Sequence, residues 1–226
     1  VYTTLELLKN GTIENNLFES VKNPWGGPDL TLADLLQGLL MTGDPEAAEA
    51  VRQTLQLSEK DFSRQLNHTA NALGMFATKF TFPCNENTPC ISTAQDMALL
   101  AESLYTHHAI SRIWGASHSL TLPDGKILHT ENFFLEKSPA ITGVYVSPKR
   151  EHIASSAAVL SENPKGSDGR LRRLLAVSLN NNDRDSLRQE ISSLLLRGYR
   201  DYETLKLYSE GDFVANVPIY KGEETD

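Results

Sequence analysis

The sequence has no long hydrophobic run, no excess of positive charge and only two cysteines. No stretch reaches the roughly 18 consecutive apolar residues of a transmembrane helix, so we expect no membrane span in this chain. Its 29 acidic residues outnumber the 21 basic ones, for a net charge of −8. This balance argues against a nucleic-acid partner, which favours a basic surface. The 226 residues are 40% apolar and 22% charged, which is ordinary for a globular protein with a sizeable core.

The two cysteines lie close together, and turn-forming residues fill the interval between them. Cys84 and Cys90 are therefore predicted to form a local disulfide, which would fit an oxidising compartment. The alternative is a pair of unpaired loop thiols. No histidine or second cysteine pair lies nearby at ligand spacing, so no metal site is predicted. We expect no cofactor.

Helical patterns fill the first part of the chain and strand patterns follow. Apolar spacing and capping residues predict helices over 2–9, 32–40, 45–55, 58–73, 93–104 and 183–196. Strands are predicted over 117–122, 127–129, 153–160 and 174–179, with an edge strand over 213–220 and loops over 23–28 and 163–169. Helices first and strands later favour an α+β fold, with a helical cluster packed on an antiparallel sheet.

Several helix starts carry residues that cap N-termini. Thr31 and Ser58 are predicted to cap the helices that follow them, and Pro45 suits a first helical position. Two starts leave a choice. The helix after residue 91 is capped by Ser92 or Thr93, and the last long helix by Asp183 or Asp185.

Two stretches resemble one enzyme family. The sequence Asn71-Ala72-Leu73-Gly74, followed by Ser92 to Leu100, is similar to stretches of the D-alanyl-D-alanine carboxypeptidases. These are the low-molecular-weight penicillin-binding proteins, serine peptidases that trim peptidoglycan. Further similar stretches occur in the family's order at 35–40, 198–204 and 211–225.

This resemblance implies a fold, a boundary and a location. The fold would be that of the β-lactamases and DD-peptidases. Residues 1–209 would form the carboxypeptidase-like domain, and 210–226 would begin a small C-terminal β segment. The protein would act in the periplasm or on the extracytoplasmic face of a bacterial envelope.

The family's chemistry requires three motifs. Ser-x-x-Lys supplies the nucleophile and its base, Ser-x-Asn a second hydroxyl and a substrate-holding amide, and Lys-Thr-Gly a cation for the substrate carboxylate. No Ser-x-x-Lys occurs in these 226 residues. By the resemblance it would lie several residues before Val1, with the family's first strands further upstream, so we expect an excerpt or a processed chain.

The second motif falls at residues 41–45 and is altered. In one alignment Thr42 and Asp44 replace the serine and the asparagine, which keeps a hydroxyl but introduces a negative charge. In another, Gly43 and Pro45 occupy those positions and nothing functional remains. The structural alternative is a turn between two helices, in which Asp44 caps and Pro45 begins the second helix.

The third motif falls at residues 140–146 and lacks its cation. Either Thr142 replaces the lysine, or Thr142 and Gly143 match the Thr-Gly and Ile141 replaces it. The loss should weaken carboxylate recognition by about 2 kcal/mol. The structural alternative is a buried strand. Arg184, at the start of the last helix, is a further candidate for substrate binding by the resemblance.

Two functional hypotheses follow. In the first, the chain is a catalytically inactive member of the family that acts as a binding, scaffolding or regulatory module. Its partner would be a peptidoglycan stem peptide or an envelope protein. In the second, it belongs to an active serine D-Ala-D-Ala carboxypeptidase whose nucleophile lies before Val1 and in which Thr42 replaces the second serine.

Overall fold

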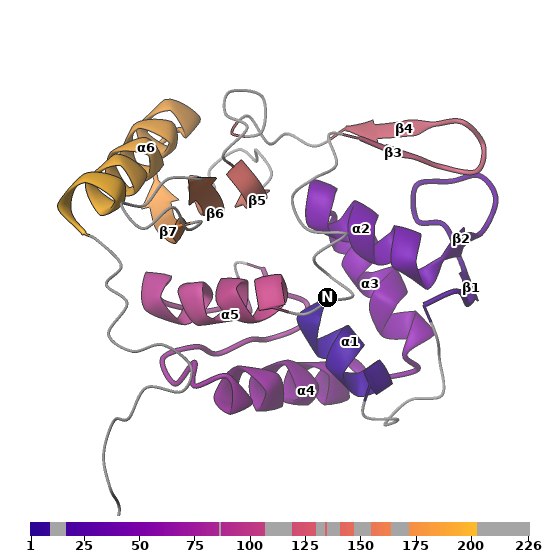
Figure 1. Cartoon of the computed structure of the whole chain (residues 1–226). Helices are drawn as coiled ribbons and strands as arrows, with labels where there is room; N and C mark the ends of the chain where they lie inside the picture. The colour runs from indigo at the N-terminus through magenta and orange to yellow at the C-terminus, as the bar shows by residue number, and fades with distance from the viewer. Residues whose placement is uncertain are drawn as a thin grey trace, which may run out of the picture.

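The computed structural model describes residues 1–9, 17–85, 87–106, 119–129, 134, 141–146, 155–163 and 172–202. The helices are α1 (Tyr2–Lys9), α2 (Leu32–Thr42), α3 (Pro45–Thr54), α4 (Glu59–Ala72), α5 (Ala94–Thr106) and α6 (Arg184–Asp201). The strands are β1 (Ser20–Val21), β2 (Leu30–Thr31), β3 (Ser119–Thr121), β4 (Ile127–His129), β5 (Ile141–Val146), β6 (Ser155–Asn163) and β7 (Arg172–Asn181). Helices α1 to α4 gather to one side of the molecule, and α6 lies on the other (Figure 1).

Side-chain caps fix where four of the helices begin. Thr31, Ser58, Thr93 and Asp183 each accept a hydrogen bond from the backbone N–H three residues on, at 3.1, 3.1, 3.1 and 2.7 Å. These bonds satisfy N–H groups that the first turn of a helix leaves without a partner. The predicted caps are confirmed, and the two open choices are resolved in favour of Thr93 and Asp183.

The main sheet is antiparallel, with the strand order β5-β6-β7. Val159 of β6 pairs with Val144 of β5 and with Ala176 of β7, so β6 is the central strand. Helix α6 packs on one side of β6 and β7 and α5 lies on the other (Figure 1). A hairpin of β3 and β4 reaches out toward the loop between β1 and β2. The predicted α+β class, with helices packed on an antiparallel sheet, is confirmed.

Two apolar clusters form the core among the described residues. The larger joins the helical cluster, the β3–β4 hairpin and the near face of the sheet, and Leu32, Leu35 and Leu36 of α2 lie wholly buried in it. The smaller lies between the sheet and α6, where Leu187 and Ile191 are wholly buried. The helical spacing of these leucines is therefore a core stripe, as the sequence pattern predicts.

The short ladder between β1 and β2 was not predicted from the sequence. Ser20 pairs with Thr31 and Val21 with Leu30, and the N–H of Leu32 donates to the carbonyl of Glu19 at 3.0 Å. Strands of two residues are too short to show an alternating pattern. The predicted loop over 23–28 connects the two strands.

The predicted disulfide between Cys84 and Cys90 is present, with the two Cα atoms 5.7 Å apart. Among the described residues, no helix combines the length and the apolar character needed to cross a bilayer. The proposed boundary at residue 209, the strand predicted over 213–220 and the loop after residue 163 lie outside the described residues.

Candidate functional site

The junction of α2 and α3 holds the candidate second motif. Gly43 ends α2 in the left-handed conformation, with φ 58°, and its N–H donates to the carbonyl of Leu39 at 2.8 Å. Asp44 then caps α3, and Pro45 is the first residue of that helix. The structural alternative for this segment, a capped turn between two helices, therefore describes its backbone.

Both carboxylate oxygens of Asp44 accept hydrogen bonds. Oδ1 accepts from the N–H of Glu46 at 2.9 Å, and Oδ2 accepts from the indole Nε1–H of Trp25 at 2.9 Å. An asparagine has a single acceptor oxygen and an NH₂ group that only donates. An asparagine here would therefore lose one of the two bonds, which gives aspartate a local structural reason at this position.

The hydroxyl of Thr42 is also engaged inside the turn. Its Oγ1 donates to the carbonyl of Gly38 at 2.8 Å and accepts from the N–H of Asp44 at 3.3 Å. A helical threonine commonly bonds back to the carbonyl four residues before it. The proton that a catalytic hydroxyl would exchange is here directed at the helix backbone.

Trp25 connects the loop between β1 and β2 to the α2–α3 turn through contacts with Asp44 and Gly38. Its ring lies against Gly38, where a Cβ atom would come within 2.2 Å of Cη2 of the indole. On the other side, Lys126 of the β3–β4 turn donates from Nζ to the carbonyl of Trp25 at 2.9 Å. The candidate site is thus built from three segments: the loop over 23–28, the α2–α3 turn and the tip of the hairpin.

The sequence pattern of residues 23–28 predicts only a loop and does not single out Trp25. The available signal was a large aromatic residue amid prolines and glycines. A tryptophan buries a large apolar surface and its N–H finds a partner when buried. That combination indicates a packing partner, but the sequence alone does not say which helix the ring meets.

The third candidate motif lies on β5, at the edge of the described sheet. Gly143 pairs with Leu160, and the register shifts between Ile141 and Gly143, so Thr142 falls at this irregularity. The surroundings of Thr142 and Gly143 lie outside what the structure describes. Their roles in substrate binding therefore stay predictions.

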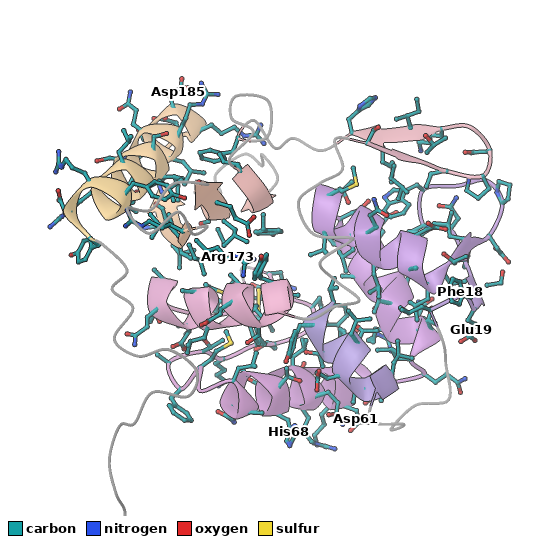
Figure 2. All side chains as sticks on the ribbon, viewed as in Figure 1. Phe18, Glu19, Asp61, His68, Arg173 and Asp185 are labelled. Carbon is teal, nitrogen blue, oxygen red and sulfur yellow. A yellow bond between two sulfur atoms is a disulfide. The ribbon has the colours of Figure 1, made fainter. Side chains whose placement is uncertain are left out.

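Arg184 is the first residue of α6, directly after the cap Asp183. Asp185, the next residue, lies at the end of α6 that is well separated from α2 and α3 (Figure 2). The structure thus brings Thr42 and Asp44 together and leaves Arg184 on another part of the molecule. A ligand role for Arg184 stays a prediction. In the described part of the chain, no three His, Cys, Asp or Glu side chains are grouped to hold a metal ion.

Comparisons with known proteins agree with the fold. Residues 10–143 match the sequence model of the family described as D-alanyl-D-alanine carboxypeptidase. The chain belongs to this family. It is 24% identical over 202 residues to the D-alanyl-D-alanine carboxypeptidase DacF of Bacillus subtilis (strain 168), a match that covers 88% of this chain and 50% of DacF. The chain thus spans about half the length of this curated relative.

Solved structures give the same fold. Penicillin-binding protein D2 of Listeria monocytogenes in its ampicillin-bound form superposes with a TM-score of 0.72 at 18% identity, over 88% of this chain and 83% of that one. Penicillin-binding protein 6B of Escherichia coli superposes with a TM-score of 0.71 at 17% identity, over 93% and 71%. At such identities these matches show the fold alone.

Proposed function

We propose that this chain is a carboxypeptidase-like domain without peptidase activity, which serves the bacterial envelope as a binding, scaffolding or regulatory module. It would act in the periplasm or on the extracytoplasmic face of the envelope. Its partner would be a peptidoglycan stem peptide or another envelope protein. Family membership supports the setting, and the altered motifs support the loss of activity.

The observation that carries the proposal is the use of Asp44. In the family's chemistry an amide at this position donates to the substrate, but an ionised carboxylate only accepts. Both oxygens of Asp44 already accept hydrogen bonds, from Trp25 and Glu46. The negative charge would also oppose an anionic substrate.

The hydroxyl of the second motif and the cation of the third motif also differ from what the family's chemistry requires. Thr42 donates its proton to the carbonyl of Gly38, so proton transfer would first require that bond to break. The position of the motif lysine carries Ile141 or Thr142, neither of which can pair with a carboxylate. Losing that charge-assisted bond should cost about 2 kcal/mol of carboxylate binding.

A fluorescent penicillin tests the proposal on the full-length natural protein. We expect no covalent labelling on a denaturing gel, under conditions that label penicillin-binding protein D2 of Listeria monocytogenes as the positive control. Labelling that excess ampicillin competes away would overturn the proposal and favour an active peptidase in which Thr42 replaces the second serine.

Binding without catalysis can be measured separately. A peptide ending in D-Ala-D-Ala is titrated by calorimetry into the protein and into an Asp44→Asn variant, with Asp61→Asn on the exposed surface of α4 as the matched control. If the turn contacts the peptide carboxylate, Asp44→Asn should strengthen binding by about fivefold, since it removes an opposing charge near the anion. Equal behaviour of the two variants would exclude the turn as the carboxylate site and leave a protein partner.

A further inference from the structure

A groove of about 680 Å³ runs between β1 and α3, next to the candidate site. One wall is the segment over residues 19–24, which includes β1, and the other is one face of α3. Pro24 and Pro45 line it where it reaches Trp25 and Asp44. Glu19, labelled in Figure 2, lies beside β1 at the groove wall. The volume is within the usual range of ligand pockets.

The shape of the groove fits an extended chain. Along the helical wall, Glu46, Glu49, Ala50 and Gln53 follow one another at the spacing of a single helix face. Six consecutive residues line the opposite wall, of which Ser20 and Val21 form β1 and Pro24 lies in the turn that follows. A groove walled along its length by a strand segment and a helix accepts a chain in extended conformation better than a compact ligand.

The strand wall has one backbone edge that no described strand pairs with. The carbonyl of Glu19 accepts from Leu32 on the β2 side, and Val21 pairs with Leu30. In an antiparallel ladder the backbone groups of alternate residues point to opposite sides. Ser20 and Lys22 therefore direct their backbone N–H and C=O groups away from β2. The described strands include none paired with β1 on this side.

The lining is predominantly acidic. Glu19, Glu46 and Glu49 contribute carboxylates and Lys22 contributes an ammonium group. The guanidinium of Arg52 pairs with Glu49, so Glu46 supplies the exposed negative charge of the helical wall. The hydrogen bond from Arg52 lowers the pKa of Glu49, so this carboxylate stays ionised at neutral pH. The side chain of Glu46 is exposed at the end of the groove nearest Trp25. A cationic side chain in the groove would be attracted by this wall.

We propose that this groove binds an extended, basic segment of a partner protein, which adds a strand to the open edge of β1. Main-chain hydrogen bonds would form with Ser20 and Lys22, and a lysine or arginine of the partner would lie near Glu46. The groove proposal specifies the kind of partner for the binding role proposed above, and it rests on that proposed function. Penicillin labelling does not report on the groove, so the two proposals can fail separately.

The probe is a fluorescein-labelled heptapeptide that alternates valine and lysine, titrated into the full-length protein and followed by anisotropy. We expect saturable binding. The same peptide with N-methyl groups on alternate backbone nitrogens should bind at least about tenfold more weakly, since each lost main-chain bond removes affinity. A version with glutamate for lysine should not bind, since its charges oppose the acidic wall.

Two charge reversals at helix starts locate the site. Glu46→Lys in the first turn of α3 should weaken binding by about fivefold. Asp185→Lys in the first turn of α6, outside the groove, is the matched control and should leave binding within about twofold, because it changes the same total charge at a distance. Circular dichroism verifies that both variants fold.

Three results would overturn the proposal. The first is no saturable binding of the valine–lysine peptide. The second is equal affinity of the N-methylated peptide, which would mean charge attraction without strand addition. The third is an equal effect of Asp185→Lys, which would mean attraction to the net charge of −8 rather than to the groove. Self-association in sedimentation velocity that Glu46→Lys abolishes would assign the groove to a second copy of the chain.

Discussion

Two junctions between helices, α2–α3 and α4–α5, each depend on one aspartate, but they use it differently. At the α4–α5 junction, Asp96 is 6% exposed and a single oxygen, Oδ2, accepts both from the N–H of Ala77 at 3.0 Å and from the hydroxyl of Thr78 at 2.6 Å. At the α2–α3 junction, Asp44 is half-buried and divides its two bonds between two oxygens.

The two aspartates also differ in how their surrounding sequences relate to the family. Asp96 lies in the stretch Ser92 to Leu100, which is similar to stretches of the family, and its side chain holds the loop between two helices. Asp44 lies in the segment predicted to hold the second motif, where in one of the two alignments it replaces the family's asparagine. In that alignment the chain would keep residues that support the scaffold and differ in one that would contact a substrate. The fold is therefore shown, while the loss of activity stays a proposal.

The largest expected effect on stability is at the α4–α5 junction, where Asp96 is buried. Asp96→Ala should lower the free energy of unfolding by about 3 kcal/mol, since it leaves the N–H of Ala77 and the hydroxyl of Thr78 without their acceptor. Urea unfolding followed by circular dichroism measures this loss. Asp96→Asn is the control and should cost only about 1 kcal/mol, because one amide oxygen can accept both bonds without the charge. Similar losses for the two variants would contradict the role of the shared oxygen.

A second test concerns the close approach of Trp25 to α2. Gly38→Ala should destabilise the protein by about 2 kcal/mol, since its Cβ would come within 2.2 Å of the indole ring. The ring has little freedom to move, because Asp44 holds its N–H. The usual gain of about 1 kcal/mol for alanine over glycine in a helix is too small to offset this overlap.

Gly198→Ala in α6 is the matched control for this overlap. Its Cβ would come within 2.8 Å of Cδ1 of Leu174, which is the end of a flexible side chain that can rotate away. Thermal unfolding of the two variants should therefore give opposite or clearly unequal shifts. Equal shifts would mean that the indole ring is not fixed against α2.

A third test separates the two oxygens of Asp44. Asp44→Asn and Trp25→Phe should each cost about 1 kcal/mol, because each removes one hydrogen bond of the pair. In the double variant the asparagine oxygen can turn to Glu46, so the combined loss should be smaller than the sum by about 1 kcal/mol. Strict additivity in urea unfolding would show that Trp25 and Asp44 are not coupled.

Much of the fold could be predicted because its signals are local. The helix starts at Thr31 and Ser58 carry capping side chains directly before apolar stripes, and the hairpin surrounds a Pro-Asp-Gly turn. The disulfide joins cysteines only six residues apart. Each of these features depends on residues within a few positions of one another, so the sequence alone was sufficient.

The site could be predicted only in part, because its contacts join distant segments. Trp25 and Asp44 are 19 residues apart, and Lys126 bonds a carbonyl 101 residues earlier in the chain. No periodicity links such positions. The groove was not predicted either, since it requires the two-residue strand β1 to lie beside α3.

The smallest expected effect on stability is at an exposed aspartate, Asp183, at the start of α6. The hydrogen bond from the N–H of Ser186 lowers the pKa of Asp183 below its ordinary value of 3.8, so the ionised form is favoured in the folded state. Its contribution to stability is therefore complete above about pH 4 and is lost as the pH falls through the lower, folded-state pKa. Asp183→Ala should lower the midpoint of thermal unfolding at pH 7 and have less effect near pH 2 to 3.

Asp183→Asn keeps a capping acceptor without a titratable group, so its stability should change less with pH than that of the wild type. A wild-type advantage over Asp183→Asn that grows on acidification would have the wrong sign for this cap.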